Sequence, residues 1–140
     1  MPTAGYSGTP LARKLGLAPG MRLLLIGAPD GYATWIAPAP AGLACVSRAT
    51  APAAVHLFTT RRADLERRLA TLRRTLAQDG VVWVSWPKKS SRVATDVTED
   101  VIRAVALPMG FVDVKVCAVT DSWSGLKLVI RVSERVKGKR

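Results

Sequence analysis

Residues 53–86 read AAVHLFTTRRADLERRLATLRRTLAQDGVVWVSW, in which two apolar runs flank a leucine-rich segment. The runs, at 53–58 and 81–86, show little alternation of polar and apolar residues, which is typical of strands buried on both faces of a sheet. Between them, four leucines recur at spacings of four, three and four residues, so they form one apolar face of a helix over 61–77. The stretch therefore predicts a strand–helix–strand unit with parallel strands.

Further strands and helices are predicted on both sides of this unit. Apolar segments with the character of strands lie at residues 21–26, 43–47, 111–119 and 126–132. Short helices are predicted over 9–16 and 32–36, and a longer helix after Asp96. The last two strands, joined by a turn at 120–125, form a hairpin whose final strand is antiparallel to the others. Together these elements predict one α/β domain over residues 1–132, with a mostly parallel sheet, followed by a basic, flexible tail at 133–140.

The two longer helices differ in the charge at their starts. Asp96 is followed three residues later by Glu99, a spacing at which a cap and a third-position side chain satisfy free backbone amides. The buried stripe predicted for that helix consists of Val97, Val101, Ala104 and Val105. The leucine-rich helix instead begins with Arg61 and Arg62, whose charges oppose the helix dipole by roughly 0.3–1 kcal/mol each. Either an anion binds at that end or both side chains extend into water.

Composition sets limits on the class of protein. The chain has 140 residues, 49% of them hydrophobic, and 21 Lys+Arg against 10 Asp+Glu give a net charge of +11. Such a chain has enough apolar content for a core, and its surface attracts phosphate-rich partners. Cys45 and Cys117 lie in separate apolar runs, which indicates a reducing compartment and excludes a thiolate zinc cluster. Without a membrane-spanning run or a signal-peptide pattern, the sequence predicts a cytoplasmic protein that does not bind membranes.

Polar and aromatic residues gather in the loops that follow the predicted strands. In an open parallel sheet these loops share the carboxyl edge, where ligands bind. The candidate ligand-binding residues in them are Asp30, Tyr32, Arg61, Arg62, Trp86, Lys88, Lys89 and Trp123. We expect a bound anion to lie between the Arg61–Arg62 pair and the Lys88–Lys89 pair. The loops at the opposite edge contain only ordinary turn residues.

Several of these residues also have a structural interpretation. Asp30 precedes a glycine, which is the usual turn pair, while Trp86 and Trp123 either stack on a flat ligand or close the top of the core. His56, the only histidine, lies within a buried strand and is interpreted as a core residue rather than a catalytic base. No serine lies in a G-x-S-x-G turn, and no residues have metal-ligand spacing, so neither a hydrolase triad nor a metal site is predicted.

The stretches Tyr6-Ser7-Gly8-Thr9-Pro10, Ser85-Trp86-Pro87-Lys88-Lys89 and Thr98-Glu99-Asp100 resemble a family of small bacterial proteins known only as a domain of unknown function. The likeness runs from Tyr6 to about Arg131 and implies no particular reaction.

The order of elements is also similar to that of Rossmann-like S-adenosylmethionine-dependent methyltransferases, which implies a three-layer fold. That likeness implies S-adenosylmethionine as a cofactor near residues 27–31. However, Gly27-Ala28-Pro29-Asp30-Gly31 lacks the second glycine of a G-x-G loop, and Cys45-Val46-Ser47-Arg48 ends in a cation where those enzymes carry an acid.

Three functions follow as hypotheses, and the sequence does not separate an enzyme from a binding protein. The first is a methyltransferase-like domain that binds a small anionic or nucleotide-like ligand, or a protein partner, at the carboxyl edge. The second is an S-adenosylmethionine-dependent methyltransferase. The third is non-specific, salt-sensitive association with nucleic acid through the basic surface and the tail residues Arg135, Lys137, Lys139 and Arg140.

Overall fold

A single mixed sheet organises the part of the chain that the computed structural model describes, residues 9–136. Its six strands lie in the order β2-β1-β3-β4-β6-β5. They are β1 (Arg22–Ile26), β2 (Ala44–Val46), β3 (Ala54–Phe58), β4 (Val81–Pro87), β5 (Phe111–Ala118) and β6 (Trp123–Ile130). The first four strands pair in parallel, whereas β6 is antiparallel to both β4 and β5. The predicted parallel sheet with a closing antiparallel hairpin is confirmed.

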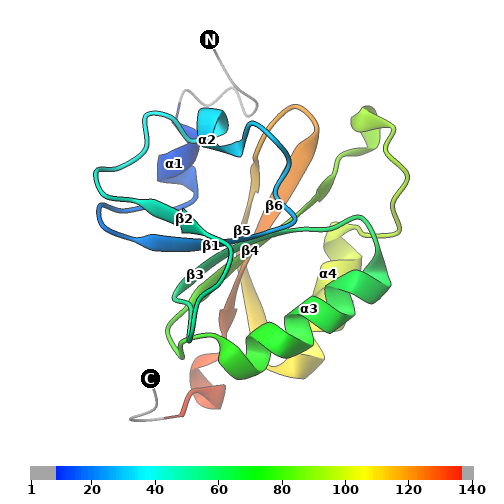
Figure 1. Cartoon of the computed structure of the whole chain (residues 1–140). Coiled ribbons are helices and arrows are strands. Elements are labelled where there is room, and N and C mark those ends of the chain that lie inside the picture. The colour runs from blue at the N-terminus through cyan, green and yellow to red at the C-terminus, as the bar shows by residue number, and fades with distance from the viewer. Residues whose placement is uncertain (1–8, 137–140) are drawn as a thin grey trace.

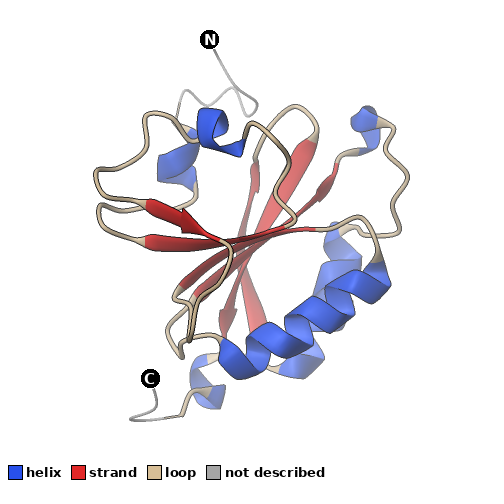
Figure 2. Cartoon of the chain, viewed as in Figure 1, coloured by secondary structure: helices blue, strands red, loops and turns tan. Residues whose placement is uncertain are grey.

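Helices cover both faces of this sheet. They are α1 (Leu11–Lys14), α2 (Tyr32–Trp35), α3 (Arg62–Thr75) and α4 (Glu99–Ala106), with short 3₁₀ helices η1 (Lys89–Ser91), η2 (Leu107–Met109) and η3 (Val132–Glu134). Figure 1 shows α1 and α2 on one face and α3 and α4 on the other, and Figure 2 shows the sheet between the two helical layers. Each layer has its own cluster of buried side chains. The three-layer α/β architecture predicted from the sequence is therefore confirmed.

The leucine stripe of α3 forms the centre of the larger cluster. Leu65 and Leu69 are fully buried, and Leu72 and Leu76 are nearly so, against apolar side chains of β3 and β4. All five residues of β3 are buried, as expected for a central strand of a doubly covered sheet. Burial of this kind contributes about 1.5–3 kcal/mol per large aliphatic side chain, so this face supplies much of the stability of the domain.

The predictions for α4 need two corrections. The helix begins at Glu99, and its cap is Thr98, whose Oγ1 accepts the backbone N–H of Val101 at 3.1 Å. Asp96 lies before the helix and does not cap it. Of the predicted stripe, Val105 is confirmed, but the other buried residues of the helix are Ile102 and Ala106. Val97 is buried but precedes the helix, Val101 is half-buried, and Ala104 is exposed.

The carboxyl-terminal segment also differs in detail from its prediction. β6 begins at Trp123, so this residue lies on a strand rather than in the hairpin turn. The predicted tail contains the end of η3, and Arg135 donates from Nε to the carbonyl of Ile130 at 3.0 Å. The backbone N–H of Val136 donates to Oε1 of Gln78 at 2.8 Å, so residues 133–136 contact the domain. The tail residues Lys137, Lys139 and Arg140 lie outside the described residues.

Candidate functional site

The carboxyl ends of the parallel strands border an open cleft of about 710 Å³, which we call the edge cleft. Its lining comes from Gly27 after β1, residues 58–61 at the end of β3, the first turns of α3, and Trp123 at the start of β6. Elements far apart in the sequence meet here because parallel pairing brings the ends of β1, β3 and β4 to one edge. The predicted convergence is confirmed for the segments after β1 and β3 and for Trp123, whereas the loop after β4 contributes no residue to this lining.

Gly27 allows β1 to end close to β3. Its φ is +70°, and a Cβ at this position would lie 2.8 Å from the carbonyl oxygen of Phe58. No side chain fits in that space, and the left-handed backbone favours glycine. The Phe58 ring lies edge-on to Trp123, with ring centroids 5.0 Å apart and planes at 82°. These contacts give the edge cleft a rigid aromatic wall.

The polar groups of the edge cleft come from the segment 59–67, which leads into α3. Thr59 Oγ1 donates to Oδ2 of Asp64 at 2.9 Å, and Arg67 donates from Nη2 to Oδ1 of the same carboxylate at 2.7 Å. Asp96 caps this helix, since its Oδ1 accepts the backbone N–H of Arg62 at 2.6 Å. The carboxylate that relieves the basic start of α3 is thus supplied by the chain itself.

The guanidinium of Arg61 stands apart from this network. Arg61 is exposed and lines the edge cleft, and its side chain makes no hydrogen bond or ion pair with any of residues 9–136. Its neighbour Arg62, by contrast, pairs with Glu66 at 3.1 Å. Within the lining, Arg61 is therefore the cationic side chain available to an anionic ligand, while Arg67 is already paired with Asp64.

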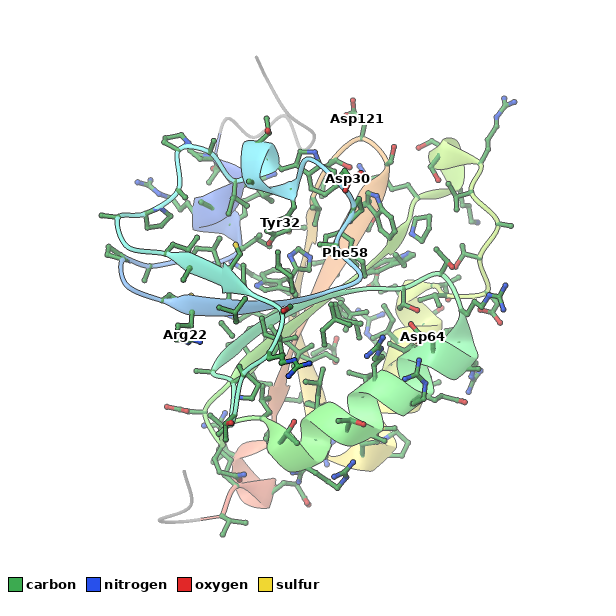
Figure 3. The ribbon with its side chains drawn as sticks, viewed as in Figure 1. Arg22, Asp30, Tyr32, Phe58, Asp64 and Asp121 are labelled. Atoms are coloured by element: carbon green, nitrogen blue, oxygen red, sulfur yellow. The ribbon has the colours of Figure 1, made fainter. Side chains whose placement is uncertain are left out.

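The aromatic candidates separate into one cleft residue and two core residues. Trp123 is half-buried and lines the edge cleft. Trp86 is only 8% exposed, because it continues the alternating face of Val82 and Val84 that packs on α3 and α4. Tyr32 is 4% exposed, and Figure 3 shows it directed into the molecule near Phe58. Trp86 and Tyr32 are thus core residues and not part of the cleft lining, and for Trp86 this is the structural alternative given in the sequence analysis.

The remaining polar candidates lie outside the lining of the edge cleft. Asp30 is exposed, and Figure 3 shows it at the upper rim of the molecule in that view. The backbone N–H of Lys88 donates to the carbonyl of Ser122 at 2.9 Å, which holds the start of the loop after β4 against the hairpin. Lys89 is exposed in η1. The edge cleft therefore includes Arg61 but neither Lys88 nor Lys89. The expected anion site between the arginine pair and the lysine pair is not part of this cleft.

Asp64 and Arg67 were not among the sequence candidates. They lie three residues apart in the first two turns of α3, directly after a carboxyl-terminal strand end, and both line the edge cleft. Charged residues at that spacing share a helix face. Their place on the helix that directly follows the end of β3 was the sequence signal that could have identified them.

A chain of three buried polar side chains lies behind the aromatic wall. His56 is completely buried, with Nδ1 2.7 Å from the hydroxyl of Tyr32 and Nε2 2.7 Å from Oγ of Ser85. Burial lowers the pKa of His56 to about 3 and raises the pKa of Tyr32, so the imidazole is neutral, with one nitrogen donating and the other accepting. Ser85 is also fully buried, which leaves no access for a substrate. The interpretation of His56 as a satisfied core residue is confirmed.

Two broader properties concern residues 9–136 as a whole. No helix among these residues has the length and hydropathy required to span a lipid bilayer. No three His, Cys, Asp or Glu side chains in the same range gather closely enough to hold a metal ion.

Comparison of sequences identifies a family match. Residues 49–132, more than half of the chain, match the model of a family described as protein of unknown function (DUF3052). The matched range includes the Ser85–Lys89 and Thr98–Asp100 motifs, whereas the motif at residues 6–10 lies outside it. A comparison with curated proteins gave no significant match.

Comparison of structures finds methyltransferase-like neighbours. A Sulfolobus solfataricus protein, named as a candidate type 11 methyltransferase, has a TM-score of 0.60 and 12% identity over 93% of this chain and 95% of its own. A fibrillarin pre-rRNA processing protein from Methanococcus jannaschii has a TM-score of 0.56 and 11% identity over 88% of this chain and 69% of its own. At these identities the similarity concerns the fold alone, and it agrees with the Rossmann-like architecture predicted from the sequence.

Proposed function

The chain belongs to the DUF3052 family of proteins of unknown function and has a methyltransferase-like fold, and from this we propose that it binds a small anionic, nucleotide-like ligand in the edge cleft. The observation that carries the proposal is that one lining contains both the Arg61 guanidinium, which has no partner among residues 9–136, and the aromatic ring of Trp123. A guanidinium binds phosphate through charge-assisted hydrogen bonds, and an indole offers a flat surface to a base.

The volume and the neutralised surroundings of the edge cleft support this class of ligand. About 710 Å³ lies within the range typical of small-molecule sites. The single carboxylate in the lining, Asp64, is occupied by Thr59 and Arg67, so it does not oppose an incoming anion as strongly as a free carboxylate. Thr60 is half-buried in the same lining and adds a hydroxyl beside Arg61. The polar side of the edge cleft therefore favours a negatively charged group.

The residues fit S-adenosylmethionine less well. Gly27 has a structural reason to be glycine, because a Cβ there would lie 2.8 Å from the carbonyl oxygen of Phe58. No second glycine follows it at the G-x-G spacing. Ser47 and Arg48, which follow β2, line a different cleft on the α3 side of the sheet, so no carboxylate from β2 is available for a ribose. The methyltransferase alternative thus rests on the fold alone. The titration described next distinguishes it from binding of a nucleotide-like ligand.

The test is isothermal titration of the full chain with adenosine, AMP and ATP, and with S-adenosylmethionine and S-adenosylhomocysteine. We expect affinity to rise with the number of phosphates and to fall about 10- to 100-fold in Arg61→Ala, the range for one hydrogen bond to a charged group. Arg62→Ala is the matched control, because Arg62 is adjacent, equally charged and outside the lining. Trp123→Phe should weaken base-containing ligands but not inorganic pyrophosphate.

Each other outcome has a defined meaning. Equal losses of affinity in Arg61→Ala and Arg62→Ala would show that the net charge of +11 alone attracts the ligand. Binding of every ligand that disappears at high salt would show the same, and would fit the non-specific association with nucleic acid. Preferential binding of S-adenosylmethionine, unaffected by Arg61→Ala, would favour the methyltransferase alternative. Absence of binding by any of these ligands at millimolar concentration would overturn the proposal.

A further inference from the structure

A second cleft, of about 340 Å³, lies on the α3 side of the sheet between β1, the loop after β2 and the outer flank of α3. We call it the flank cleft. Its floor is apolar and includes Leu24, Ile26 and Leu72, all of which belong to or pack against the larger core cluster. Arg67 contributes to the linings of both clefts, but the other residues of the flank cleft are its own. The flank cleft is thus a separate concavity with a hydrophobic base.

Three arginines contribute to the lining of this cleft. Arg67 and Arg68 come from α3, and Arg48 comes from the loop after β2. Arg67 and Arg68 share one carboxylate, that of Asp64, at 2.7 and 3.6 Å, while Arg48 makes no hydrogen bond or ion pair with any other described residue. No acidic side chain belongs to the lining itself. The positive charge gathered here is therefore only partly compensated.

One of these guanidiniums has an unsatisfied donor. Nε of Arg68 is shielded from solvent and has no hydrogen-bond partner, since its distance to Oδ1 of Asp64 exceeds that of a hydrogen bond. A buried donor without an acceptor is unfavourable, and polar groups in folded proteins rarely remain so. Ser47 and Thr71 place hydroxyl groups in the same lining. Nε itself is out of reach of a ligand, but the Arg68 side chain is 42% exposed, so its terminal nitrogens can donate to an oxyanion in the cleft together with these hydroxyls.

We propose that the flank cleft binds a phosphate-bearing small molecule whose less polar part lies on the floor formed by Leu24, Ile26 and Leu72. Guanidinium and hydroxyl donors match the oxygens of a phosphoryl group, and converging arginines are a recurring means of binding it. The inference does not depend on the function proposed for the edge cleft, because its charge comes from Arg48 and Arg68, neither of which lines that cleft.

The experiment is a titration of the isotope-labelled full chain with inorganic pyrophosphate, followed by amide NMR shifts. We expect shifts centred on residues 47–49 and on Thr71, and an affinity about tenfold or more lower in Arg48→Ala and in Arg68→Ala. Arg74→Ala is the matched control, since Arg74 is an exposed arginine of the same helix outside both linings. It should change the affinity less than twofold, on the order of a surface charge effect. Arg61→Ala should leave these shifts unchanged.

The proposal would be overturned by shifts spread over the whole basic surface, by an Arg74→Ala effect as large as that of Arg48→Ala, or by no shifts at millimolar pyrophosphate. Shifts confined to Thr60 and Trp123, and abolished by Arg61→Ala, would support the edge cleft while overturning the flank cleft. If Arg68→Ala unfolds, Arg68→Lys keeps the charge but removes the planar pair of terminal donors, and should still weaken binding. Arg48 is an exposed loop residue, so its substitution tests the site without disturbing the core.

Discussion

The buried imidazole of His56 makes the stability of the domain depend on pH in a range where carboxylates do not titrate. His56 is fully buried between the hydroxyls of Tyr32 and Ser85, and burial lowers its pKa from 6.5 to about 3. Between these two values the unfolded chain binds a proton that the folded chain does not. The free energy of unfolding therefore decreases as the pH falls below about 6.5 and increases as the pH rises towards it.

The size of the effect follows from the two pKa values. With 6.5 in the unfolded state and about 3 in the folded state, lowering the pH from 7 to 5 should cost about 2 kcal/mol of stability through this one group. The pKa of Asp113 is lowered by its hydrogen bond from Arg103, so this residue also stabilises the folded domain less in acid. That loss begins only as the pH approaches the ordinary pKa range of a carboxyl group. The interval from about pH 7 to pH 5 therefore isolates the histidine.

The assay is urea unfolding, followed by tryptophan fluorescence, of the wild-type chain and of His56→Gln at constant ionic strength. Glutamine retains a donor and an acceptor for Tyr32 and Ser85 but does not titrate, so its stability should change little over this interval, whatever its absolute value. Parallel pH dependences for the two proteins would refute the reasoning. A native His56 titration near pH 6.5, measured by NMR, would refute it as well, because no difference in proton uptake would then remain.

The remaining predictions concern stability measured by the same urea assay. Asp96→Ala removes the cap of α3 and should cost about 1 kcal/mol, while Asp121→Ala, at an exposed turn position, should change little. Gly27→Ala should cost more than about 1 kcal/mol, since its φ is +70° and the new Cβ would lie 2.8 Å from the Phe58 carbonyl oxygen. Leu69→Ala empties a fully buried site at the centre of the larger core cluster and should cost about 2–5 kcal/mol.

Each of these predictions has a clear contrary result. Equal stability of Asp96→Ala and Asp121→Ala would mean that the Asp96 carboxylate does not cap α3. A neutral Gly27→Ala would mean that β1 and β3 are not held as close as the structure places them. A loss below about 1 kcal/mol in Leu69→Ala would be inconsistent with a well-packed core at this position.

The order and type of the elements were predictable because each long element carries its own periodic signal. The leucine spacing of α3 predicts one buried face, and the continuous apolar runs of β3 and β4 predict strands buried on both faces. The structure buries these residues as predicted. The rule that parallel strands end at one edge then placed the loops around the edge cleft without any side-chain detail. Arg61 and Trp123 were found in this way.

The chain sequence alone thus specified the strands, the leucine helix and the edge at which they end, because those features depend on local patterns of apolar residues. Partners distant in the sequence had to be seen in three dimensions. Asp96 and Thr98 are both good caps, and only the proximity of Asp96 to the backbone amide of Arg62, 34 residues earlier, shows which helix each one serves. Likewise, its place after the first strand suggested a ligand role for Tyr32, but its hydroxyl bonds to His56 inside the core because folding brings α2 over β3.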